Sequence, residues 1–185
     1  MSISKKNIKF LIIFYIFISF SFNLNNTYAA SGSGGSGNNA TSLYKSGEKL
    51  VLKAKKLEEK NKIEKANKLY LKAYKKLEKA YAKDKKNADI LNYLGFTLRK
   101  TGKLKEAEEF YLKGLQLDAG HLGINEYLGE LYVQTGRIEL AKERLQVING
   151  CKCEEYKELK ELIEKNLNAY NRIYWSCTSF CIIFN

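Results

Sequence analysis

Two stretches of this 185-residue chain decide its fold: "NYLGFTLRKTG" at residues 92–102 and "EYLGELYVQTG" at residues 126–136. They begin 34 residues apart, and both place glycine after leucine and end on glycine. A similarity held over this period predicts helix–turn–helix units that stack on one another. Gly102 and Gly136 would end the first helix of each unit, because helices commonly stop at a residue in the left-handed conformation.

The glycines inside these helices need a separate explanation. Glycine in a helix interior costs about 1 kcal/mol relative to alanine. Gly95 and Gly129 stand at the same position of each unit, which indicates that another helix approaches closely there. We expect Gly95 to meet Ala107, and Gly129 to meet Ala141, on the second helix of each unit.

The motif L-G-x-x-L-x-x-x-G-x-L-x-x-A-x-x-x-Y, Leu94 to Tyr111, resembles the tetratricopeptide repeat, and Leu128 to Leu145 carries a similar series. Leu91 and Asn125 stand where that family often has tryptophan, and Gly114 where it has alanine. The resemblance implies an all-α, helix–turn–helix repeat solenoid. Its two clear units would cover about residues 88–121 and 122–151.

A third, degenerate unit is predicted upstream at an offset of seven further residues, with Ala54 and Leu57 on its first helix and Ala66 and Tyr70 on its second. Seven residues are almost two helical turns, so an insertion of this length keeps the apolar face. The predicted helices are 43–60, 62–83, 87–101, 104–117, 121–135 and 138–149, followed by a capping helix from about 153. Repeat arrays need such an atypical terminal element with a polar outer face.

The two ends of the chain differ from this domain, which we place at 43–168. Residues 1–29 have three lysines, an apolar run over 10–22 and small residues before Ala30, as a signal peptide does. The run would reach only ~20 Å, against ~30 Å for a membrane core, so cleavage after Ala29 is favoured over a retained anchor. The chain is therefore expected to be exported, periplasmic or secreted. A Gly/Ser linker is predicted at 30–42, and an apolar tail of unknown structure at 169–185.

The positive charge is concentrated in one segment. The whole chain has a net charge of +12, yet residues 45–86 hold sixteen lysines against six acids, and residues 87–185 thirteen bases against fourteen acids. The lysine-rich helix 62–83 could attract an anionic membrane or envelope surface, or remain a solvated face. Export argues against a nucleic-acid partner.

Four cysteines occur near the C-terminus. In an exported chain they can form disulfides. We expect Cys151 or Cys153 to pair with Cys177 or Cys181, because closure of Cys-Lys-Cys alone would be a very small ring. The spacing is not that of a usual zinc site, so no metal is predicted.

No catalytic arrangement, nucleotide motif or cofactor motif is found, so we expect a non-catalytic adaptor or scaffold. His121 is alone and reads as a turn residue or helix cap. By resemblance to the family, the concave groove would be lined by the first helix of each unit and would bind a protein or peptide segment. The residues expected to face it are Asn92, Tyr93, Phe96, Arg99, Lys100, Glu126, Tyr127 and Glu130, with Lys55 as a further candidate.

Overall fold

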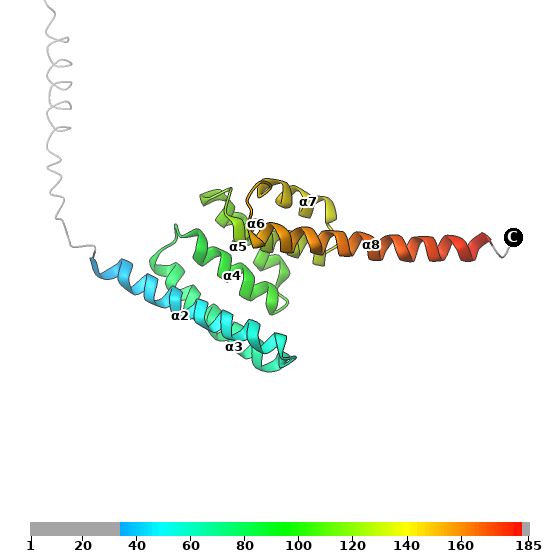
Figure 1. Cartoon of the computed structure of the whole chain (residues 1–185). Coiled ribbons are helices and arrows are strands. Elements are labelled where there is room, and N and C mark those ends of the chain that lie inside the picture. The colour runs from blue at the N-terminus through cyan, green and yellow to red at the C-terminus, as the bar shows by residue number, and fades with distance from the viewer. Residues whose placement is uncertain (1–33, 183–185) are drawn as a thin grey trace, which may run out of the picture. The chain divides into compact units, whose positions relative to one another are not determined.

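The computed structural model describes the backbone of residues 34–182 and the side chains of residues 39–169. This part of the chain contains seven α-helices and no strand, in the order α2 to α8 (Figure 1). Their bounds are α2 Gly34–Glu59, α3 Ile63–Lys83, α4 Ala88–Lys100, α5 Leu104–Leu117, α6 Leu122–Gln134, α7 Ile138–Val147 and α8 Glu154–Ile182. The predicted all-α repeat architecture is confirmed, with helix ends within a few residues of those expected except at the two termini of the domain.

The helices pack as successive pairs, α2 with α3, α4 with α5 and α6 with α7. The first helices also contact each other in series, α2 with α4, α4 with α6 and α6 with α8. Among the described residues α3, α5 and α7 make no such contacts with one another. The first helices and α8 therefore form an inner row, and the second helices lie outside it.

Three turns with the same hydrogen-bond pattern join the helices of the three pairs. The backbone N–H groups of Lys62, Lys103 and Arg137 donate to carbonyl oxygens five residues earlier, at 2.8, 2.9 and 2.8 Å. The residue before each donor has a positive φ: 53° at Asn61, 84° at Gly102 and 75° at Gly136. This is the six-to-one bond of a helix C-terminus. Asn61 lies 41 residues before Gly102, so the predicted offset of the degenerate unit is confirmed.

The glycines at the helix contacts confirm a close approach but correct its partners. A Cβ atom on Gly95 would lie 2.6 Å from the ring of Tyr111, and one on Gly129 would lie 2.6 Å from Leu159 of α8. The atoms nearest to these positions therefore do not belong to Ala107 and Ala141, although both alanines are buried. Tyr111, one turn after Ala107, fills the space beside Gly95, and Leu159 of α8 fills the space beside Gly129.

Helix α2 begins at Gly34, within the segment that was expected to be a linker. Ala40 is only 3% exposed, and Gly47 packs against Leu77 of α3. The low helix propensity of glycine and asparagine is only a weak guide to structure. The linker prediction is therefore wrong from residue 34 onward.

Helix α8 caps the array, as predicted, by placing Leu159 and Ile163 against α6 and α7. It continues to Ile182, so the backbone of most of the segment expected as a separate tail is helical. The side chains beyond Ala169 lie outside the described residues, as do the predicted signal peptide and its cleavage site. Within the described part of the chain, no helix combines the length and apolarity needed to cross a membrane.

Candidate functional site

The eight residues predicted to line the groove come from α4 and α6, which are neighbours in the inner row. The structure brings them together, but it divides them into two groups. One group is covered by cations and is packed, and the other lines an open pocket.

The packed group surrounds Phe96, which is 3% exposed. Its ring lies 4.8 Å from that of Tyr127 and 5.8 Å from that of Tyr70. Three cations stand over it: Lys55 at 5.6 Å, Arg99 at 5.5 Å and Lys100 at 6.0 Å from the ring centroid. Phe96 therefore belongs to the core and is not a solvent-accessible binding residue. Helix α2 covers the face of α4 that the repeat pattern would leave open to a partner.

The cations of this group are themselves paired. Arg99 forms an ion pair with Glu130, and Lys100 lies 2.8 Å from a carboxylate oxygen of Glu58. Both pairs cross between helices and are largely shielded from solvent. Cation–π contacts of this type are worth about 0.5–2 kcal/mol according to how far they are desolvated. This end of the inner row is thus occupied by the protein's own side chains.

The open group lines a pocket of about 480 Å³, which we call the acidic pocket. Its wall is formed by Tyr44, Glu48, Asp89, Asn92, Tyr93, Asp118, Gly120, His121, Leu122, Gly123, Glu126, Tyr127 and Glu155. These residues come from all four helices of the inner row and from the turn before α6. Five are acidic, and His121 is the single basic member.

Two tyrosines close one side of the pocket. The rings of Tyr44 and Tyr93 meet edge to face at 5.8 Å. Their hydroxyls donate to the same oxygen of Glu48, at 3.5 and 3.3 Å. Burial, with the nearby carboxylates adding to it, raises the pKa of Tyr93 to about 12 and moves that of Tyr44 higher still. Both hydroxyls therefore remain protonated donors at neutral pH.

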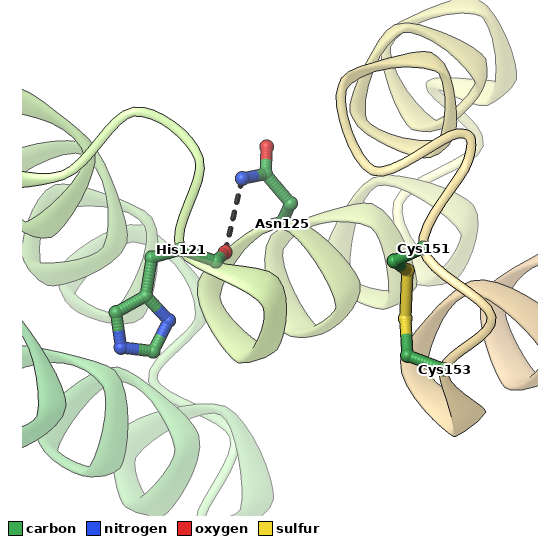
Figure 2. Close-up of a disulfide and its surroundings, with 4 residues drawn as sticks. All are labelled: His121, Asn125, Cys151 and Cys153. Atoms are coloured by element: carbon green, nitrogen blue, oxygen red, sulfur yellow. Dashed lines mark hydrogen bonds between the residues drawn. A yellow bond between two sulfur atoms is a disulfide. The ribbon is translucent and has the colours of Figure 1, made fainter.

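His121 acts as the N-cap of α6, as the sequence indicated. Its Nδ1 accepts a hydrogen bond from the backbone N–H of Ile124 at 3.2 Å, and its Nε2 lies 3.2 Å from Asp89. Asn125 donates to the carbonyl oxygen of His121 at 3.0 Å, which Figure 2 shows as a dashed line. These contacts hold the turn that forms the floor of the acidic pocket.

Glu126 is the most buried carboxyl of the pocket, at 3% exposure. Burial, together with a hydrogen bond to Glu158 and the charge of Glu130, raises its pKa to about 9. Oxygens of these three glutamates lie within 4.8 Å of one another and could in principle hold a cation. Glu130 is already paired with Arg99, however, and a neutral Glu126 is a poor ligand, so the cluster fits a shared proton better than a metal.

The disulfide differs from the predicted one. Cys151 is bonded to Cys153, in the connection between α7 and α8, with their Cα atoms 5.1 Å apart (Figure 2). That separation lies within the range that a disulfide spans, and the predicted pairing of these two cysteines with Cys177 or Cys181 is wrong. Cys177 and Cys181 lie on α8, outside the residues whose side chains are described.

The sequence did not reveal Tyr44, Glu48, Asp89, Asp118 and Glu155 as pocket residues. Tyr44 and Glu48 lie near the predicted start of the first helix, in a unit too degenerate for a groove position to be assigned. Glu155 belongs to the capping helix, to which no groove position was assigned. A hint was available in the acidic residues that begin predicted helices, such as Asp89 and Glu155.

Comparison with known families supports the architecture of the pair α4 and α5. The tetratricopeptide repeat family profile matches residues 88–121. A tetratricopeptide repeat protein from Parabacteroides merdae is 17% identical with a TM-score of 0.48, over 69% of this chain and 62% of its own. The chain thus spans less than two thirds of that protein.

Two further solved structures also match part of the chain. The Yersinia enterocolitica type III secretion chaperone SycD, solved with a peptide of the translocator YopD, is 21% identical with a TM-score of 0.44, over 69% of this chain and 93% of its own. The second domain of human RPAP3, solved with an HSP70 peptide, is 18% identical with a TM-score of 0.40, over 63% and 97%. No curated protein matches the sequence. The family profile matches α4 and α5, so the chain contains a tetratricopeptide repeat there, and the helix pairs on both sides of it have similar geometry.

Proposed function

We propose that this protein is an exported, non-catalytic scaffold that binds a segment of another protein along its inner row of helices. The observation that carries the proposal is the acidic pocket, about 480 Å³ in volume and built by all four helices of that row. Its volume lies within the range of ligand-binding pockets. Tyr93 and Tyr127 are half-buried there, which suits residues that become desolvated when a partner binds.

The second candidate is binding of an anionic surface through α3. Lysines 65, 68, 72, 75, 76 and 79 of α3, together with its N-cap Lys62, are all exposed, and we call them the lysine face. Within the described residues none of them forms an ion pair, so their charges are free to act on a partner. Such a surface of exposed charges binds with a steep dependence on salt.

Site-specific photocrosslinking separates the two candidates. A photoreactive benzoylphenylalanine would replace Tyr93 in the pocket or, as the matched control, Lys72 on the lysine face. We expect a protein adduct from position 93 that is lost when Tyr127→Ala is added, and little adduct from position 72. Adducts from position 72 alone, abolished by salt, would instead assign the function to the lysine face.

A further inference from the structure

The acidic pocket has a charge that distinguishes it from the rest of the inner row. Elsewhere in the row, Arg99 and Lys100 balance Glu130 and Glu58. Among the described residues, no lysine or arginine forms an ion pair with the carboxylates of the pocket. Glu48 accepts from two tyrosines, Asp118 accepts from the backbone N–H of Gly120 at 3.1 Å, and Asp89 meets only His121.

The N-termini of nearby helices do not cancel this charge. Helices α4, α6 and α8 begin at the pocket, and each N-terminus carries about half a positive charge. Even without Glu126, which is neutral at pH 7 because burial raises its pKa, four carboxylates line the wall. Four full negative charges exceed about one and a half positive ones, so the pocket is negative although the chain as a whole is positive.

Asn92 provides an independent sign that the pocket binds a polar group. It is 6% exposed, lies in the pocket wall, and its Oδ1 atom has no hydrogen-bond partner among the described residues. A buried acceptor without a donor costs about 1–3 kcal/mol, so such groups in folded proteins normally have a partner. The group that would satisfy this oxygen is a hydrogen-bond donor.

We propose that the acidic pocket receives a lysine or arginine side chain of the bound segment, so that the partner is a basic stretch of another protein. This inference rests on the proposed function and specifies its partner. The carboxylates supply charge complementarity, and the oxygen of Asn92 accepts an N–H of the cation. The rings of Tyr44, Tyr93 and Tyr127 present the aromatic surface over which cations are stabilised.

The test uses three fluorescent peptides of identical length, acetyl-(Gly-Lys-Ala)₃, acetyl-(Gly-Gln-Ala)₃ and acetyl-(Gly-Glu-Ala)₃, with binding to the whole protein followed by anisotropy at 0.15 M salt. The lysine peptide should bind at least tenfold more tightly than the other two. The double variant Glu48→Gln, Glu155→Gln should lower the affinity for the lysine peptide by about tenfold, so that the preference is lost. The matched control Glu161→Gln, Glu164→Gln removes the same charge from exposed positions of α8 and should change binding less than twofold.

Several results would overturn the inference. Equal losses in both double variants would show a general charge effect, and absence of lysine-peptide binding would show that the pocket takes no cation. Tighter binding of the glutamine peptide, lost in Tyr127→Ala, would leave the proposed function standing while refuting the basic partner. A dimer that dissociates only in the pocket variant, without peptide binding, would identify the occupant as a second copy of the chain.

Discussion

At the scale of the residue, Gly95 makes room for a single ring. Leucine at this position should destabilise the protein by about 1–3 kcal/mol, because a Cβ would lie 2.6 Å from buried Tyr111 and the helices would have to move apart. Thermal and urea denaturation measure the loss. Gly120→Ala is the control, since a Cβ there meets only Asp118, at 3.7 Å. Equal stabilities of the two variants would contradict the close contact.

Glu126 makes stability depend on pH. Its pKa is raised from 4.5 to about 9 in the folded protein, mainly by burial. The folded state therefore holds this proton more tightly than the unfolded state, and the resulting stabilisation is complete below about pH 4.5 and lost as the pH rises through 9.

Replacing Glu126 with glutamine, which is neutral at every pH, should remove this dependence. Between pH 5 and 9 the free energy of unfolding of the parent should fall relative to Glu126→Gln by at least about 1.4 kcal/mol, the equivalent of one pKa unit. Urea denaturation at a series of pH values measures the difference, with exposed Glu161→Gln as the control. A difference that stays constant with pH would show that Glu126 titrates normally.

At the scale of the element, each repeat depends on how its helices begin and end. Asn61, Gly102 and Gly136 end the first helices with one shared geometry. The starts differ, since Asn87 caps α4 and His121 caps α6, each by accepting the backbone N–H three residues later. A histidine in this position also contacts Asp89, so it links α6 to α4 across the acidic pocket.

Removing this cap should destabilise α6. His121→Ala leaves the N–H of Ile124 without its acceptor and should cost about 0.5–2 kcal/mol, whereas His121→Asn keeps a capping oxygen and should recover most of the loss. Chemical denaturation of the two variants gives the comparison. If alanine and asparagine were equally destabilising, the contact with Asp89 rather than the cap would be the important one.

At the scale of the whole molecule, opposite charges occupy different helices. The acidic pocket lies on the inner row, and the lysine face lies on α3, an outer helix.

We propose that the chain works outside the cytoplasm, so the mature protein should begin at Ala30. Mass spectrometry of the exported protein would measure its N-terminus, and intact Met1-containing chain in the membrane fraction would show that the segment is retained as an anchor.

The sequence by itself determined the repeat. The spacing of Leu94, Gly95 and Gly102, repeated 34 residues later, predicted the helix pairs, their turns and the degenerate third unit. These features depend on neighbours close in the chain, where helix periodicity and the glycine conformation act directly. The eight expected groove residues were also correctly placed on adjacent helices, because helical spacing assigns each side chain to a face.

Only the tertiary structure decided what each face contacts. Phe96 was expected to be an accessible anchor, but Lys55 from α2 and the paired Arg99 and Lys100 cover it. The pocket combines residues as distant in sequence as Tyr44 and Glu155, which no local pattern relates. The same holds for Gly129, whose partner Leu159 belongs to the capping helix. Burial and charge pairing depend on contacts between distant segments, so periodicity predicted the helices but not the site they build.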